Sequence, residues 1–145
     1  MFDALSTFDA DSLQTAFSSN SYFPMPVTKT TPVQVPGPGG KTIHEHVGHV
    51  ATGTAGLSVA HMIAPPGWSE PAQTPAFDEV TVVLQGTMRV EHGAGAFTDV
   101  GPGETVLVTA GERVRYVNPS ATEGSEYWAV CTPAFSPGAV NREAE

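Results

Sequence analysis

Residues 67–86 read GWSEPAQTPAFDEVTVVLQG, and residues 103–118 read GETVLVTAGERVRYVN. The first stretch contains a run rich in β-branched residues over 79–84, and the second contains two, over 105–109 and 113–118. Gly or Pro lies close to the ends of these runs, a pattern that predicts short strands separated by turns. The two stretches therefore predict an all-β fold.

The same pattern extends outward along the chain. Strands are predicted over 42–52, 57–64, 79–84, 87–91, 105–109, 113–118 and 126–131. Several short strands with turns every ~8–12 residues favour a sandwich or a barrel. A helical apolar spacing occurs over 1–20, and five prolines between 24 and 38 exclude a regular helix there. We predict an N-terminal helical and extended arm over 1–40, a barrel over 41–135 and a tail over 136–145.

The charge balance narrows the class of partner. The chain has 145 residues, a single-domain length, with six Lys and Arg against fifteen Asp and Glu. Nucleic acids and anionic membranes require clustered cations, which the chain lacks, so neither is an expected partner. No apolar run reaches ~20 residues and no signal peptide is visible, so we expect a cytoplasmic protein. Cys131 is the only cysteine, which excludes an intrachain disulfide and a cysteine-built zinc site.

The spacing within both stretches resembles the two sequence motifs of the cupins. The first motif runs Gly67, five residues, 73–75, three residues, Glu79, six residues, Gly86. The second runs Gly103, five residues, 109–111, two residues, Val114, three residues, Asn118. The chain is thus similar to small single-domain bacterial cupins of the cupin-2 type. The resemblance implies a double-stranded β-helix, or jelly-roll barrel, and the apolar spacing over 1–20 adds a short N-terminal helical segment.

The residues of this chain depart from that family at its metal site. The family places two His and a Glu in the first motif and a His in the second, where they bind a divalent metal. Here those positions are Gln73, Pro75, Glu79 and Val114, and only Glu79 offers an ordinary ligand. We therefore expect no cofactor at the usual cupin site. The segments 67–70, 78–80 and 84–86 also resemble the ethanolamine-utilisation branch of cupins, which likewise lacks the histidine pair.

Strand alternation predicts which side chains face the barrel interior. If Glu79 points inward, Thr81 and Val83 share its face, and Val114 places Tyr116 on the inner face of its own strand. His61 lies six residues before Gly67, where cupins often have a polar pocket residue, so we expect it to point inward with Val59 and Ile63. For the last strand, alternation leaves two faces open: Glu126, Trp128 and Val130, or Tyr127 and Ala129.

These positions give candidate site residues. Glu79 is the first candidate, because burial in a Val-rich barrel beside Asp78 favours a raised pKa suited to acid or base catalysis. His61 is a second catalytic candidate, with a satisfied core histidine as the equal alternative. Glu70, Gln73, Tyr116 and Trp128 are the candidate substrate-binding residues. A solvated loop acid is the simpler interpretation of Glu70, and core packing that of the two aromatic residues.

A histidine pair on another predicted strand allows a different chemistry. His44 and His46 would share one face, and with His61 and Glu79 they could form a non-standard site for Zn, Fe or Ni. Three or four ligands are required, and the family has no metal on this strand. An exposed strand at a subunit contact is therefore the favoured interpretation.

Together these features predict an enzyme that transforms a small molecule by acid/base chemistry, of isomerase, cyclase, dehydratase or lyase type. A ligand-binding or sensor cupin without catalysis is the alternative, and a metal-dependent cupin with a non-standard site is a further one. The ethanolamine branch also suggests a kinase-like or microcompartment-associated protein, but no nucleotide motif supports it. The expected ligand is a small polar neutral or cationic molecule, and the expected assembly is a homodimer.

Overall fold

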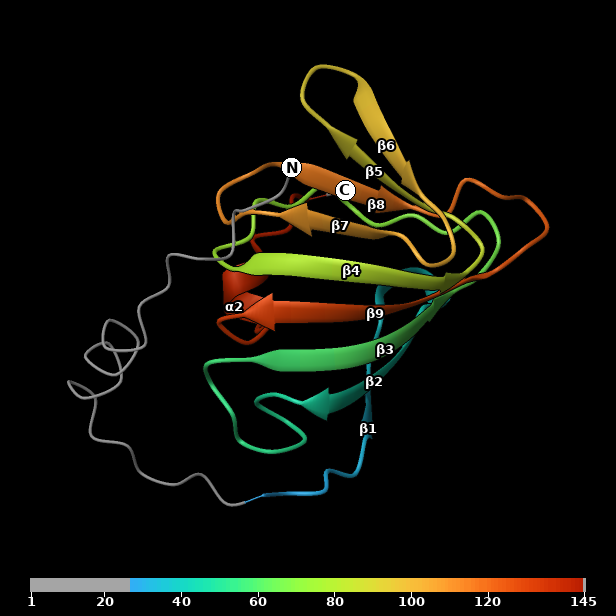
Figure 1. Ribbon diagram of the computed structural model, residues 1–145. Coiled ribbons are helices and arrows are strands. Elements are labelled where there is room, and N and C mark those ends of the chain that lie inside the picture. Colours follow the sequence, from blue (N-terminus) through green and yellow to red (C-terminus); the bar gives the residue numbers. More distant parts are fainter. Residues whose placement is uncertain (1–26, 145) are drawn as a thin grey trace, which may run out of the picture.

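The computed structural model describes residues 27–144, and the helical segment expected over 1–20 lies outside them. The elements, in chain order, are β1 (Val33–Val35), a 3-10 turn η1 (Pro38–Gly40), β2 (Thr42–Val47), β3 (Ser58–Ala64), β4 (Asp78–Gln85), β5 (Met88–His92), β6 (Ala96–Val100), β7 (Thr105–Val108), β8 (Val114–Val117), β9 (Ser125–Thr132) and α2 (Pro137–Val140). The expected all-β class is confirmed (Figure 1).

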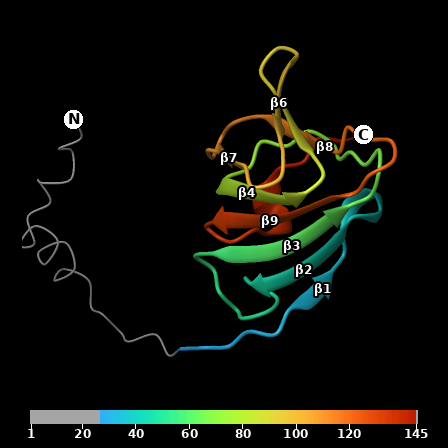
Figure 2. The same cartoon turned by 45° about the vertical axis from the view of Figure 1, so that its right-hand side comes forward.

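The strands form two antiparallel sheets. The larger has six strands in the order β1-β2-β3-β9-β4-β7, and the smaller has three in the order β6-β5-β8. Figure 2 shows the strands of the larger sheet following one another from β1 to β4 as a curved surface. Because β9 returns to lie between β3 and β4, strands distant in sequence meet, as in a jelly roll.

The main apolar core lies between the two sheets. It contains Val83 of β4, Met88 and Val90 of β5, and Tyr116 of β8, all at most 4% exposed. The alternation predicted for β4 and β8 is confirmed: Thr81 and Val83 are buried on one face of β4, and Val114 and Tyr116 on one face of β8. This pattern follows from the two-residue period of strands that cover a core on one side.

Three strands differ from the sequence prediction. β6 was not predicted, because Ala96–Val100 lies just after Gly93 and Gly95 and four of its five residues are exposed. β1 was also not predicted, because it is three residues long and follows Pro32. β1 pairs with β2, so part of the segment expected to be an arm belongs to the sheet. The strand predicted over 42–52 ends at Val47.

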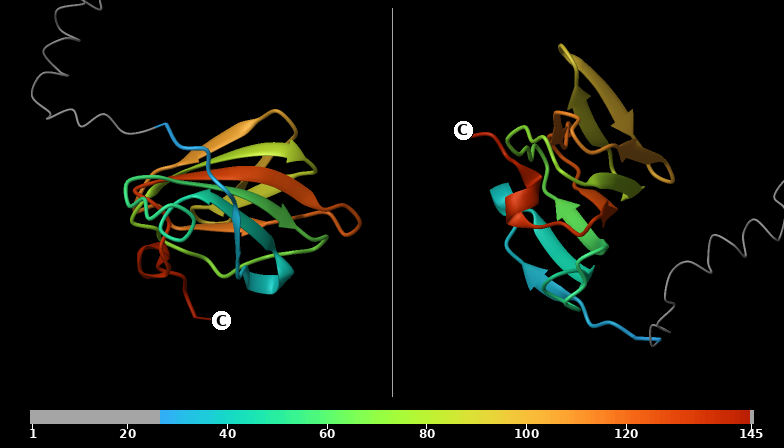
Figure 3. Two further views of the ribbon diagram at one scale, coloured as in Figure 1. Left: turned by 90° about the horizontal axis from the view of Figure 1, so that it is seen from below. Right: turned by 90° about the vertical axis from the view of Figure 1, so that its left-hand side faces the viewer.

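The segment 68–73, between β3 and β4, lies against the smaller sheet. The backbone of Gln73 exchanges two hydrogen bonds with Val114 of β8, at 2.8 and 2.9 Å. The end of the chain then lies against this segment, where the amide of Glu143 donates to Ala72 O at 2.8 Å. The C-terminal segment, red in Figure 3, thus belongs to the wall of the barrel.

Asn118 fixes the return from β8 to β9. Its side-chain amide donates to the carbonyls of Ala64, Pro65 and Glu123, and its Oδ1 accepts from the amide of Ser120. Since Asn118 is 1% exposed, these bonds satisfy a buried polar side chain and several loop carbonyls at once.

Within residues 27–144, no helix is long and apolar enough to cross a membrane.

Candidate active site

A pocket opens on the inner face of the larger sheet, beside the main core. Its floor is formed by alternate residues of β3, β4 and β9, and its walls by Tyr116 of β8, the segment 70–77 and the residues around η1. The centres of water molecules can occupy a volume of about 70 Å³ inside the pocket. One water needs roughly 10–15 Å³ of such volume. The pocket is therefore suited to a small molecule.

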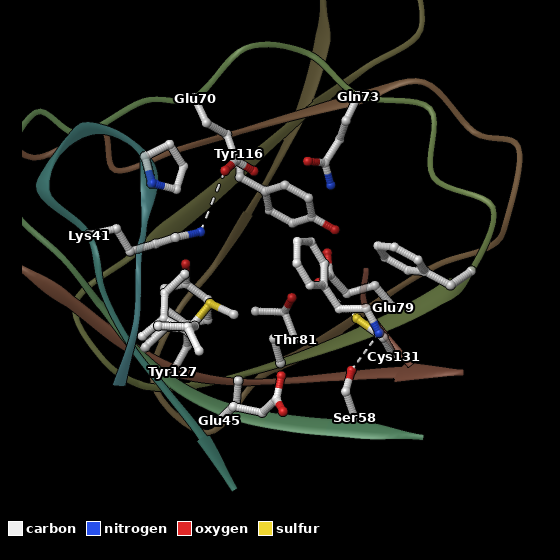
Figure 4. Close-up of a pocket in the computed structure, with 18 of the residues that line it drawn as sticks. Lys41, Glu45, Ser58, Glu70, Gln73, Glu79, Thr81, Tyr116, Tyr127 and Cys131 are labelled. Atoms are coloured by element: carbon white, nitrogen blue, oxygen red, sulfur yellow. Dashed lines mark hydrogen bonds and ion pairs between the residues drawn. The ribbon is translucent and has the colours of Figure 1, made fainter. Parts of the chain in front are cut away.

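Glu79 lies on the floor of this pocket (Figure 4). Its partner in the ladder is Cys131 of β9, and the Cys131 thiol donates to Glu79 Oε2 at 3.3 Å. Removal from water raises the pKa of the Glu79 carboxyl, and Tyr116, Lys41 and Cys131 offset only part of this effect. Glu79 is thus a carboxyl biased toward its neutral form at the base of a pocket.

The thiol of Cys131 lines the pocket and contacts Glu79. Burial raises the pKa of this thiol, and the adjacent Glu79 raises it further. Cys131 therefore remains a protonated hydrogen-bond donor to Glu79 Oε2, and a thiolate nucleophile is disfavoured.

Two polar atoms of the wall are buried without a hydrogen bond of normal geometry in the described part of the chain. They are the Tyr116 hydroxyl and Gln73 Oε1, on residues that are 4% and 3% exposed. Figure 4 shows the Tyr116 hydroxyl pointing toward Glu79. Buried polar atoms are normally hydrogen-bonded, so Gln73 Oε1 is available to a ligand's hydroxyl. The Tyr116 hydroxyl interacts with the Glu79 carboxyl, whose pKa it lowers, and a ligand bound beside Glu79 would meet both groups.

A charged group forms another wall. Glu70 Oε2 lies 3.5 Å from Lys41 Nζ and 3.4 Å from Arg142 Nη2. The Lys41 and Glu70 side chains are only 5% and 3% exposed, so Glu70 is not the solvated loop acid that its position suggested. Lys41 and Arg142 come from outside the two motifs, and sequence reasoning did not place them in the site.

His61 does not face the pocket. On β3 the pocket-lining residues are Ser58, Ala60 and Met62, so the expected inward orientation of His61, Val59 and Ile63 is wrong by one position. His61 Nε2 instead lies 2.8 Å from Glu126 Oε1 on the opposite face of the sheet. The expected contact between His61 and Glu79 therefore does not form.

The pairing of β9 explains the placement of Trp128. Because Glu79 pairs with Cys131, the alternate residues Ala129 and Tyr127 share the pocket face. This selects between the two faces that alternation left open. Trp128 lies on the other face, with its ring 5.1 Å from that of His61, and so it does not line the pocket as a substrate-binding residue.

The non-standard metal set is divided between the two faces of the sheet. His44 is paired with His61 in the ladder, and His46 packs against Trp128 at 4.9 Å between ring centroids, whereas Glu79 lies in the pocket. Among residues 27–144, no three His, Cys, Asp or Glu side chains are grouped so as to hold a metal ion. His44, His46, His61 and Glu79 thus do not form one site.

At the positions where cupins have their metal ligands, the residues present do not fit a metal. Glu79 and Gln73 reach the pocket, but Pro75 and Val114 are buried residues without a donor side chain. A carboxylate and one amide oxygen fall short of the three or four ligands that a transition metal requires. The chemistry of the pocket must therefore be derived from its own acids, amine and hydroxyls.

Comparisons with known proteins agree with this architecture. A stretch of 109 residues is 48% identical to a protein of Myxococcus xanthus named endoribonuclease YbeY, covering 75% of this chain and 36% of that protein. This chain therefore spans about a third of the length of that relative.

Two solved structures share the fold. The polyketide cyclase RemF of Streptomyces resistomycificus has a TM-score of 0.62 and 21% identity, with 83% of this chain and 87% of RemF covered. Ethanolamine utilization protein Q of Salmonella typhimurium has a TM-score of 0.52 and 16% identity, with 76% of this chain and all of that chain covered. Residues 60–130 match the family described as the cupin domain, and this part of the chain has the cupin double-stranded β-helix.

Proposed function

We propose that the pocket binds a small polar molecule and that Glu79 transfers a proton to or from it. The observation that carries this proposal is the placement of Glu79: a carboxyl with a raised pKa on the floor of a pocket, toward which the Tyr116 hydroxyl points. A carboxyl whose pKa is raised toward neutrality can both donate and accept a proton under physiological conditions. Isomerisation, cyclisation, dehydration and lyase reactions all use such a step.

The other pocket residues take supporting roles in this proposal. The Tyr116 hydroxyl and Gln73 Oε1 orient a hydroxyl or carbonyl of the ligand beside Glu79, and the Cys131 thiol stabilises the carboxylate once its proton has left. Glu70, which we expected to bind substrate, holds Lys41 and Arg142 in the wall. His61 and Trp128 have no part in the proposal because they lie on the other face of the sheet.

The names of related proteins limit the proposal as well as support it. RemF is a polyketide cyclase, and cyclisation lies within the proposed range of reactions. The relative named as an endoribonuclease is matched over only 36% of its length, and a net charge of -9 disfavours binding to RNA phosphates. The proposal therefore does not include RNA cleavage.

The test is proton exchange into a small molecule. Hydroxyacetone and related small hydroxy-carbonyl compounds are incubated with the protein in D2O, and loss of their carbon-bound proton signals is followed by NMR. We expect the Glu79→Gln variant to exchange ~100-fold more slowly than the wild type, which is the typical contribution of an acid/base residue. The control is Glu112→Gln, which removes an exposed carboxylate elsewhere and should exchange as the wild type does.

Equal exchange rates in the wild type and Glu79→Gln would contradict the role of Glu79. Binding of a compound to the wild type, seen as a rise in melting temperature, without any exchange would favour the alternative of a ligand-binding or sensor cupin.

A further inference from the structure

Lys41 is a buried amine in the wall of the pocket that the proposed proton transfer does not use. It follows η1 directly, and the amide of Lys41 closes that turn on Pro38 O at 3.3 Å. Its side chain is 5% exposed and lines the pocket, where Nζ lies 4.5 Å from the centroid of the Trp68 ring. The backbone turn and the ring together fix the direction of the side chain.

The surroundings of Lys41 favour the neutral amine more than a surface position does. Burial lowers the pKa of Lys41, and the negative charges of Glu70 and Glu79 offset only part of this effect. The contact with Glu70 is single and long, at 3.5 Å, and Glu70 is shared with Arg142. A desolvated lysine of this kind is a usable nucleophile toward carbonyl carbon.

The same pocket holds the acid that such a reaction needs. Glu79 is close enough that its charge acts on Lys41, and the buried Tyr116 hydroxyl points toward Glu79. Figure 4 shows the Lys41 amine and Glu79 on opposite sides of one space, with Tyr116 between them. A small carbonyl compound in that space would contact an amine, a carboxylic acid and a hydroxyl.

We propose that Lys41 forms an imine with an aldehyde or ketone substrate, so that the substrate class of this pocket is a small carbonyl compound. This inference rests on the proposed function, because Glu79 supplies and removes the protons. Protonated Lys41 first gives up a proton, which the Glu79 carboxylate takes. The neutral amine then adds to the carbonyl carbon and forms a C–N bond while the C–O π bond breaks, and the proton that the nitrogen loses moves to the oxygen to give a carbinolamine. Glu79 protonates the hydroxyl, which leaves as water, and the C=N bond forms.

The charge of the wall is unchanged by this reaction. Protonated Lys41 and a neutral carbonyl compound give a protonated imine and water, so one positive charge is present before and after. Glu70 and the Trp68 ring therefore stabilise the product as they stabilise the free ammonium. The protonated imine withdraws electrons from the adjacent carbon, whose proton the Glu79 carboxylate then removes.

The sequence provides an internal control, because the chain contains two lysines, Lys29 and Lys41. Lys29 is exposed and does not line the pocket. The full chain is incubated at neutral pH with propanal and sodium cyanoborohydride, which reduces an imine to a stable propyl amine. Peptide mass mapping then measures the rate of propylation at each lysine.

We expect Lys41 to be propylated several-fold faster than Lys29, and hydroxyacetone to slow labelling at Lys41 alone. Equal rates, or faster labelling of Lys29, would overturn the proposal. Lys41→Arg keeps the positive charge, so it should remain folded and lose only the pocket adduct, while labelling of Lys29 is unchanged.

Glu79→Gln separates this inference from the proposed function. Slower propylation of Lys41 in that variant supports both. If Lys41 is labelled preferentially and at the same rate in both proteins, the imine stands and the role of Glu79 fails. If Lys41 is not labelled preferentially while Glu79-dependent exchange is observed, the imine fails and the proposed function stands.

Discussion

Replacing Glu70 by Gln tests whether the pocket contains a buried ion pair. The change leaves the shape of the side chain nearly intact but removes the only carboxylate within 4 Å of both Lys41 and Arg142 in the described chain. The Lys41 and Glu70 side chains are 5% and 3% exposed, so water cannot solvate the Lys41 ammonium once the Glu70 carboxylate is removed. Removing one partner of a buried pair costs about 3–5 kcal/mol, and we expect the unfolding free energy to fall by about 3 kcal/mol because Arg142 is partly exposed.

The chain offers a matched control in Glu91. It pairs with Arg115 at 3.4 Å, nearly the same separation, but the two side chains are 41% and 43% exposed. An exposed pair contributes less than about 1 kcal/mol, so Glu91→Gln should be close to neutral. Urea unfolding of the wild type and both variants, with equal m-values, measures the difference.

The loss in Glu70→Gln should depend on pH. Without Glu70 the pKa of Lys41 falls further below its ordinary value, so the folded state binds fewer protons than the unfolded chain over a wider pH range. Stability rises with pH wherever the unfolded state binds more protons, and the deficit of the variant therefore shrinks toward alkaline pH. A Glu70→Gln variant that matches Glu91→Gln at neutral pH would refute the buried pair.

Three further predictions concern stability. The pKa of Glu79 is raised in the folded state, so its stabilising contribution is complete at acid pH and is lost as pH rises through that pKa. Glu79→Gln should therefore match the melting temperature of the wild type below about pH 4 and exceed it near neutrality. The same difference in melting temperature at every pH would contradict this. Asn118→Ala removes four hydrogen bonds from a buried side chain and should cost about 3 kcal/mol or more in urea unfolding. Gly86, at φ +71, would place an added Cβ 2.3 Å from the carbonyl oxygen of Gly124, whereas a Cβ at Gly103, at φ +79, meets no atom within 4 Å. Gly86→Ala should therefore lower the unfolding free energy by more than about 2 kcal/mol, and Gly103→Ala by about 1 kcal/mol. Equal losses would exclude the steric contact.

Strand alternation predicted the inner faces of β4 and β8 correctly because each of these strands covers the core on one side. Thr81, Val83, Val114 and Tyr116 are all buried as expected. The inward direction predicted for His61 rested on its sequence distance from Gly67, and strand pairing does not fix that distance. The observed register places Ser58 opposite Cys131 and His61 opposite Trp128, which turns His61 away from the pocket.

The charged wall could not be predicted because its members come from distant parts of the chain. Lys41 follows a proline- and glycine-rich turn, and Arg142 lies close to the C-terminal end, so neither belongs to a cupin motif. Their convergence on Glu70 depends on how η1 and the C-terminal segment pack against residues 68–73. Long-range packing of this kind leaves no local pattern in the sequence. Arg113 and Arg115 pair with Glu143 and Glu91 and do not line the pocket.

The most direct test of the central claim is a titration of the glutamate side-chain carboxyl carbons by 13C NMR, compared between the wild type and Glu79→Gln. We expect one carboxyl that titrates above the ordinary glutamate range in the wild type and is missing from the variant, because burial in the pocket favours its neutral form. If the signal missing from the variant titrates in the ordinary range or below it, Glu79 is an ionised carboxylate at neutral pH, and the proposed proton donor is contradicted.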